Sequence, residues 1–284
     1  MMRIAIVSDI HGNLMALEAV AADIRRRGVD VVVNLGDSLS GPLLPLETAQ
    51  FLMARDWIHL AGNHERQILE LHANSGMADA FAHGQLTPNE LAWLASLRPA
   101  MQITPDVLAC HGTPTSDVTC LLQTADLAAN REEIESRLGA VDAALIMCGH
   151  SHVARSVRSV RGQLIVNPGS VGRPAYADDY PYPHVIASGS PDARYAIVEQ
   201  YQGQWRSSLL NVPYKHRQMA ALAKSRGRLD WEVALLTGYL SSIPAASNRG
   251  PSFFQIANNR QLNSFSSSDS EAWAGDVDGS TSVR

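Results

Sequence analysis

The sequence has few cysteines, no excess of basic residues and no long apolar run. Its three cysteines, Cys110, Cys120 and Cys148, are too few and too scattered for a disulfide framework or a paired-cysteine metal site. A formal net charge of −5 and a pI near 6.0 provide no positive field that would hold nucleic acid non-specifically, although a small nucleotide substrate remains compatible. No run reaches the roughly 18 apolar residues of a membrane span, and the first residues lack a signal-peptide pattern. We therefore expect a cytoplasmic protein without a membrane partner.

The first part of the chain alternates short β-branched runs with helical patterns. With 284 residues, of which 45% are hydrophobic, the chain can form one large or two small globular domains. Strands are predicted over residues 3–8, 31–35 and 57–61, with helices over 13–27 and 45–55 between them. This alternation predicts parallel strands joined by right-handed crossovers.

The remainder of the chain changes character twice. A helical insert over about residues 65–97, with a helix start at Thr87-Pro88, is expected to shape the pocket. Strands over 107–110 and 143–148, with a helix over 125–138, precede two hairpins over 153–167 and 194–212. We expect a single domain over residues 1–240, with C-terminal helices over about 213–240. Residues 241–284 are polar and aperiodic, which predicts a disordered tail.

Polar side chains follow five of the predicted strands. They are Asp9 and His11, then Asp37, then Asn63 and His64, then His111, and finally His150 and His152. Ligand sites in open α/β sheets lie at the carboxyl ends of the strands, so these side chains should meet at one rim. Imidazole, carboxylate and amide oxygen together suit divalent Mn, Fe, Zn, Co or Ni. Two carboxylates and several histidines exceed the needs of one ion, which favours a two-metal hydrolytic centre with a shared aspartate.

Each of these motifs has an ordinary structural interpretation when taken alone. Asp9-Ile10-His11 and Gly36-Asp37 are common at turns and helix starts, and His111 alone could be a satisfied core histidine. The occurrence of all five at predicted strand ends favours a functional site. The other five histidines have no such setting and are interpreted as structural or surface residues: His59, His72, His83, His184 and His216.

The complete set of motifs resembles the calcineurin-like metallophosphoesterase superfamily. The stretches DIHGN, GDSLSGP, GNHE, HGTP and NPGSVGRP are similar to its compact bacterial and archaeal phosphodiesterase branch, and the resemblance covers about residues 2–240. It implies a four-layer αββα sandwich of two mixed sheets. It also implies two divalent ions, with Mn favoured. By motif position, Asp9, His11 and His152 would hold one ion, Asn63, His111 and His150 the other, Asp37 would bridge them, and His64 would be the catalytic histidine that is not a ligand.

The activity implied by the resemblance is hydrolysis of a phosphate ester by attack of a metal-bridging hydroxide. A phosphodiesterase is favoured, with His64 stabilising the transition state or protonating the leaving oxygen. The alternatives are a phosphomonoesterase or protein phosphatase, a dinucleoside polyphosphate hydrolase, or a non-enzymatic scaffold, and the presence of His64 counts against the last.

Three further residues have open roles in the sequence. Asn13 could bind substrate phosphate at a helix N-terminus, although simple capping is favoured. Arg173 could clamp a phosphate through two hydrogen bonds or could be a surface arginine. Glu65 could orient His64 or form a surface salt bridge, and the sequence favours neither.

Overall fold

Two five-stranded sheets form the centre of the protein in the computed structural model, which describes residues 2–180 and 182–240. The first sheet has the order β14-β13-β1-β2-β3. Its strands are β1 (Arg3–Val7), β2 (Val31–Asn34), β3 (Ile58–His59), β13 (Ala193–Tyr201) and β14 (Gln204–Val212). The predicted parallel pairing of β1, β2 and β3 is confirmed, and the predicted hairpin β13–β14 adds antiparallel strands beside β1.

The second sheet also has three parallel strands, but here one antiparallel strand lies at each edge. Its order is β4-β5-β8-β10-β9. The strands are β4 (Ala100–Thr104), β5 (Val107–Cys110), β8 (Leu145–Met147), β9 (Arg155–Arg158) and β10 (Leu164–Asn167). Because β5, β8 and β10 run parallel, the chain leaves β5 and β8 at the same edge of the sheet. Both sheets are therefore mixed, as predicted.

The alternation of side chains along each strand creates the core between the sheets and the surfaces that the helices cover. In β1, Ile4 and Ile6 belong to the cluster that joins the two sheets, whereas Ala5 and Val7 pack on the other face. Successive side chains of a strand point to opposite faces, so both faces of this buried strand must be apolar. The sequence of β1 meets this demand.

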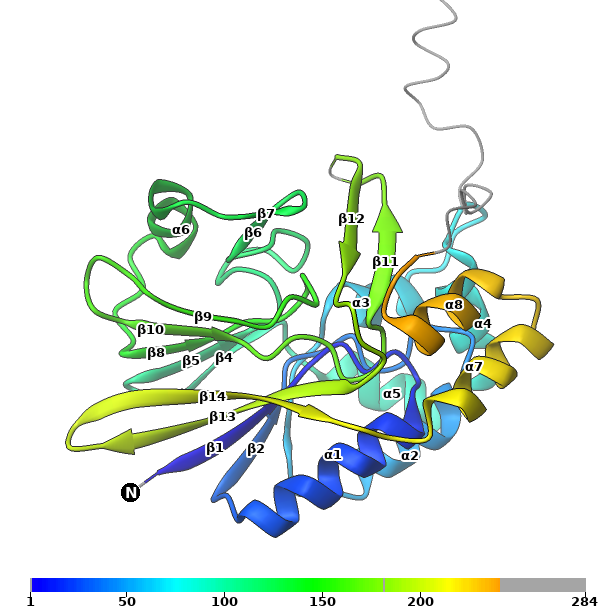
Figure 1. Cartoon of the computed structure of the whole chain (residues 1–284), viewed down its shortest axis with the longest axis horizontal. Helices are drawn as coiled ribbons and strands as arrows, with labels where there is room; N and C mark the ends of the chain where they lie inside the picture. Colours follow the sequence, from blue (N-terminus) through cyan, green and yellow to red (C-terminus); the bar gives the residue numbers. More distant parts are fainter. Residues whose placement is uncertain (1, 181, 241–284) are drawn as a thin grey trace, which may run out of the picture. The chain divides into compact units, whose positions relative to one another are not determined.

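Helices cover the outer face of each sheet and complete the four predicted layers. On the first sheet, α1 (Leu14–Arg27) and α2 (Pro45–Met53) bury apolar side chains such as Leu17 and Leu52. On the second sheet, α6 (Arg131–Leu138) covers the face of β5, β8 and β10 that is turned away from the core. Figure 1 shows the sheets one above the other, with α1 below the first and α6 above the second.

The expected helical insert and C-terminal helices are both present. The insert comprises α3 (Asn63–Leu69), α4 (Met77–Gln85) and α5 (Pro88–Ser96), and the C-terminal pair comprises α7 (His216–Ser225) and α8 (Leu229–Thr237). Thr87 caps α5 as predicted. None of the helices in the described ranges is long and apolar enough to cross a membrane. Residues 241–284 lie outside the described residues, so the domain boundary near 240 and the tail remain predictions.

The predicted helix over residues 125–138 is wrong in its first half. A small hairpin of β6 (Gln123–Thr124) and β7 (Leu127–Ala128) occupies that half, and Ala125 has a φ of 53°, which a right-handed helix excludes. The helix starts only at Arg131, because the Asn130 side chain accepts a hydrogen bond from the Glu133 N–H. The hairpin of β11 (Ala175–Asp178) and β12 (His184–Ala187) and the edge strand β4 were not predicted.

One buried polar contact fixes α1 to the first sheet. The hydroxyl of Tyr195 in β13, which is fully buried, donates a hydrogen bond of 2.6 Å to Asp23 of α1. Arg26 and Arg27 donate to the same carboxylate at 2.8 and 2.7 Å. Burial raises the pKa of Asp23, but the hydrogen bonds from Tyr195, Arg27 and Arg26 outweigh it and lower this pKa overall.

We expect Tyr195→Phe to lower the free energy of unfolding by about 1.5–3 kcal/mol at neutral pH, because the charged acceptor loses a buried donor. A folded-state pKa below the unfolded value of about 3.9 gives stability that is present above that pH and lost as the pH falls through the folded value. The difference between wild type and variant should therefore shrink below about pH 4. Urea unfolding at neutral and acid pH measures this, and a difference that grows in acid would contradict it.

Candidate metal centre

The eight polar residues that follow the predicted strands are brought together at one edge of the two sheets. Asp9 and His11 follow β1, Asp37 follows β2, and Asn63 and His64 begin α3 after β3. His111 follows β5, and His150 and His152 follow β8. Because these five strands are parallel within their sheets, their carboxyl ends converge, which is the physical basis of the predicted rim.

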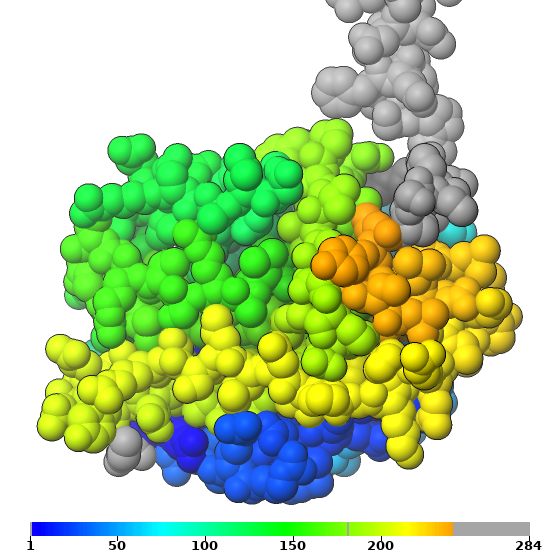
Figure 2. Space-filling model, in the orientation of Figure 1, coloured from blue at the N-terminus to red at the C-terminus, as the bar shows by residue number. Residues whose placement is uncertain are grey.

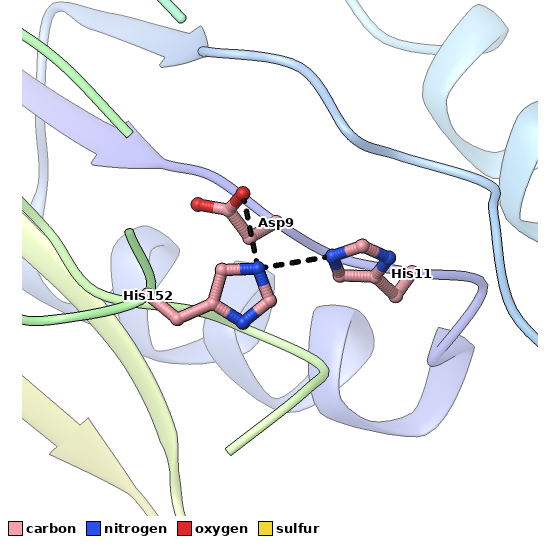
Figure 3. A group of neighbouring side chains, drawn as sticks. All are labelled: Asp9, His11 and His152. Carbon is pink, nitrogen blue, oxygen red and sulfur yellow. Dashed lines mark hydrogen bonds and ion pairs between the residues drawn. The ribbon is translucent and has the colours of Figure 1, made fainter. Parts of the chain in front are cut away.

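The first cluster consists of Asp9, His11 and His152, which Figure 3 shows facing one another. One ligand atom from each residue lies within 4.8 Å of the others. Nε2 of His11 is 3.1 Å from Nε2 of His152, and the latter atom is 3.4 Å from a carboxylate oxygen of Asp9. All three side chains are buried.

The second cluster consists of Asp37, His111 and His150, whose ligand atoms also lie within 4.8 Å of one another. Nε2 of His111 is 3.2 Å from an Asp37 oxygen and 3.2 Å from Oδ1 of Asn63. The amide oxygen of Asn63 therefore faces the same space as the three residues of the cluster. The two clusters divide the candidate ligands in the same way as the motif positions do, with Asp37 beside the second.

Hydrogen bonds to the backbone set the tautomers of the four histidines in these clusters. Nδ1 of His11, His111 and His152 lies 2.7, 2.9 and 2.8 Å from the carbonyl oxygens of residues 40, 35 and 173. Nε2 of His150 lies 3.1 Å from the carbonyl of residue 118. A carbonyl can only accept, so each of these nitrogens carries the proton. The other nitrogen of each ring then offers a lone pair, which is the arrangement found in metal-binding histidines.

The carboxylate of Asp9 faces His152 but accepts no hydrogen bond within the described residues. It is also fully buried. Burial raises the pKa of Asp9, but the facing His152 outweighs it and lowers this pKa overall. A buried carboxylate without hydrogen bonds is costly unless a cation lies beside it. The lone pairs of His11 and His152, whose nitrogens are 3.1 Å apart, would likewise be stabilised by a cation between them.

Backbone strain is concentrated in these loops. Among the described residues, seven that are not glycine have a positive φ, and five of them belong to the two clusters. Asp9, His11, Asp37, His150 and His152 have φ values between 52° and 67°. Such conformations are uncommon outside glycine, and they gather at functional sites where the surrounding structure enforces them.

Glu65 takes neither of the roles left open by the sequence. Its buried carboxylate accepts hydrogen bonds from three backbone N–H groups, those of Asp37 at 2.8 Å, Ser38 at 2.7 Å and Gly62 at 2.6 Å. Burial and the nearby Asp37 raise the pKa of Glu65, and the three N–H groups oppose this. The residue therefore ties the loop after β2 to the loop after β3. Gly62 permits the close approach, since a Cβ there would lie 2.2 Å from an Asp37 oxygen.

His64 has a partner that the sequence did not reveal. Its Nδ1 is 2.7 Å from the carboxylate of Asp79 in α4, which is 4% exposed. Its backbone N–H donates to Asp37 at 2.9 Å, and its ring lies 5.4 Å from that of His11. Burial lowers the pKa of His64, but Asp37 and Asp79 outweigh it and raise this pKa to about 9. Only the helical pattern around Asp79 was visible in the sequence.

The two candidate substrate contacts differ in their surroundings. Asn13 accepts from the Ala16 N–H and donates to the carbonyl of Gly172 and the hydroxyl of Tyr214, which supports the capping role that the sequence favours. The Arg173 guanidinium has no hydrogen bond or ion pair among the described residues. Of the five histidines interpreted as structural, none joins either cluster within residues 2–180 and 182–240.

Comparison with known proteins places the chain in a family. An uncharacterized protein of Methanocaldococcus jannaschii is 28% identical over 195 residues, which cover 60% of this chain and 76% of that protein. A metallophosphoesterase from Sphaerobacter thermophilus has a similar structure, with a TM-score of 0.64, 27% identity and coverage of 82% of this chain and 98% of that one. A hypothetical protein from Pyrococcus horikoshii shares the fold, with a TM-score of 0.65, 15% identity and coverage of 85% and 100%.

The sequence model of the calcineurin-like phosphoesterase superfamily domain matches residues 2–187. This range contains all eight polar residues of the site and both sheets except β13 and β14. The resemblance seen in the sequence motifs is thereby confirmed, and the chain belongs to the calcineurin-like phosphoesterase superfamily.

Proposed function

We propose that this protein is a metal-dependent phosphoesterase that works through a two-metal centre. Among phosphoesterases, a phosphodiesterase is favoured. The observation that carries the proposal is the set of lone pairs and unbonded carboxylate oxygens turned toward one another at Asp9, His11 and His152. This donor set fits a divalent cation, because imidazole nitrogen and carboxylate oxygen are its usual ligands.

In this proposal Asp9, His11 and His152 would hold one ion, and Asn63, His111 and His150 would hold the other. Asp37, with a carboxylate oxygen 3.2 Å from Nε2 of His111, would bind to both ions. Mn is the favoured metal, with Fe, Zn, Co and Ni as alternatives. When bound, two such ions supply Lewis acidity and make water acidic enough to serve as a nucleophile near neutral pH.

His64 acts on the ester without holding metal. Because Nδ1 faces Asp79, the free edge of the ring carries Nε2, which can donate a proton to the leaving oxygen or a hydrogen bond to the phosphoryl group. Asp79 is a positioning residue that fixes the orientation of the ring and stabilises its protonated form, as a buried carboxylate does for other catalytic histidines.

The fold does not distinguish the alternative activities from one another, so assays must. Diesterase, monoesterase, protein phosphatase and dinucleoside polyphosphate hydrolase activities could all use this centre. A scaffold without activity would not need His64 and Asp79 paired at 2.7 Å. Assays with a bis-ester and a mono-ester of 4-nitrophenol, run with each metal, test the proposal. Turnover of neither ester with any of the metals would count against it.

Metal analysis tests the centre itself. We expect the reconstituted protein to contain about two divalent ions per chain, because the two clusters offer two sets of ligands. Metal binding should also raise the melting temperature, since it compensates the buried Asp9 carboxylate only in the folded state. Elemental analysis and thermal unfolding, before and after chelation, measure both effects. Well under one ion per chain would refute the two-metal centre.

Asp37→Asn and His64→Asn should fail in different ways. Loss of the Asp37 charge removes the proposed bridge, so metal content and turnover should fall together. Loss of His64 should lower turnover by about 10²–10⁴-fold while both ions remain bound. Elemental analysis beside steady-state kinetics distinguishes the two. If His64→Asn emptied a metal site, His64 would be a ligand instead.

Asp79→Asn tests the positioning role in α4. The amide keeps the size of the side chain but removes its charge, so turnover should fall by at least about tenfold with unchanged metal content. The loss should grow with the pKa of the leaving phenol, because a poor leaving group depends most on protonation by His64. A series of substituted phenyl esters measures this, with the exposed Asp142→Asn as the matched control. An equal loss for every leaving group would mean that Asp79 only supports the fold.

A further inference from the structure

The side chain of Arg173 lies between two aromatic rings. Its Cζ is 5.1 Å from the ring centre of Tyr176 in β11 and 4.8 Å from that of Trp231 in α8. Its backbone is held as well, because its carbonyl accepts from Nδ1 of His152 at 2.8 Å and its N–H donates to the Ser170 hydroxyl at 2.8 Å. The position of the guanidinium is therefore determined by both its backbone and the two rings.

The two rings also stand against the first metal-ligand cluster. The Tyr176 ring lies 4.7 Å from that of His152, and the Trp231 ring lies 6.1 Å from that of His11. Arg173 thus lies beside the cluster of Asp9, His11 and His152. Figure 2 shows the β11–β12 hairpin, in yellow-green, directly beside α8, in orange, on the surface of the protein.

Within the described residues, the guanidinium of Arg173 and the indole N–H of Trp231 are hydrogen-bond donors without an acceptor. The guanidinium makes no hydrogen bond and no ion pair within the described ranges, although it is only partly exposed. Trp231 is 2% exposed, and its indole N–H is buried without a partner among the same residues. Arg228 also approaches Trp231, but its charge is paired with Asp230 at 2.6 Å.

Contacts with aromatic rings stabilise a cation, but they do not use its N–H donors. The two rings flank the guanidinium, so its N–H edge is what remains for a ligand. That edge matches two oxygens of one phosphate group. The ligand that would satisfy the N–H donors of Arg173 is therefore an oxyanion.

We propose that Arg173, supported by Tyr176 and Trp231, is a specificity-determining residue that binds the additional negative charge of a substrate with at least two such charges. This inference rests on the proposed phosphoesterase function. In a monoester the additional charge belongs to the phosphate that is cleaved. In a diester it belongs to another phosphate group of the same molecule, and the experiment below separates these two sources.

The subsite depends on a part of the chain outside the matched family domain. That match ends at residue 187, whereas Trp231 lies in α8. Arg226, just after α7, donates to the carbonyls of Pro42 and Leu43, which ties the C-terminal helices to the loop that follows Asp37. The C-terminal helices thereby supply one wall of the substrate site.

The test compares Arg173→Gln with wild type in the metal-loaded full-length protein, using three substrates with one leaving group. Bis(4-nitrophenyl) phosphate carries one charge and 4-nitrophenyl phosphate carries two. The 4-nitrophenyl ester of thymidine 3′-phosphate with a 5′-phosphate carries its second phosphate on a separate group. We expect KM to rise about 10- to 100-fold for at least one multiply charged substrate and less than about threefold for bis(4-nitrophenyl) phosphate.

Two further variants and a binding measurement complete the experiment. Trp231→Phe, which removes the indole N–H, should raise KM for the same substrate by a smaller factor. Arg228→Gln is the matched control, because this arginine touches the same ring with its charge already paired. Calorimetric titration with inorganic phosphate should show weaker binding to Arg173→Gln at unchanged metal content.

The outcomes separate this inference from the proposed function. An equal loss on all three substrates would show that Arg173 binds the cleaved phosphoryl group of any ester, and no loss on any would show that it binds none. Either result overturns the inference while leaving the phosphoesterase function intact. If wild type cleaves none of the three but binds inorganic phosphate in an Arg173-dependent way, the proposed function fails and the anion subsite stands.

Discussion

Three backbone N–H groups converge on the carboxylate of Glu65, and the geometry of the candidate metal centre depends on this contact. The loops after β2 and β3 hold Asp37, Asn63 and His64, and nothing in the local sequence of either loop fixes its distance from the other. Burial of a carboxylate costs free energy that hydrogen bonds must offset, so the loops are stable only when their N–H groups face Glu65. Glu65, which is not itself a candidate metal ligand, thereby sets the distance between the loops that carry Asp37 and Asn63.

The strained loops can persist because the strands that carry them cannot move. Five residues of the two clusters hold φ values of 52–67°, each of which raises the energy of its loop. These loops leave strands whose side chains are buried on both faces, between the inner core and the covering helices. A close-packed core resists displacement, so the strain remains at the edge of the sheets where the lone pairs must meet.

The parts of this structure that the sequence predicts are those encoded in short segments. The parallel strands of the first sheet and all eight polar residues of the candidate site follow from local patterns, since each of these side chains comes soon after a predicted strand. Asp79 could not be found in this way, because it lies 15 residues from His64 and on another helix. The hairpin β6–β7 was missed because the Asn130 cap and the turn at Ala125 outweigh a helix-forming composition.

The same distinction separates the chemistry of the site from its choice of substrate. The groups that can bind metal lie in short motifs, because one or two of them follow each of five strands. The groups beside the metal centre, namely Tyr176, Arg173 and Trp231, come from a hairpin, a loop and a C-terminal helix that meet only in the folded protein. Motifs therefore reveal the donor set of the candidate metal centre. In the proposed function, the choice of substrate depends on side chains whose proximity only tertiary packing creates.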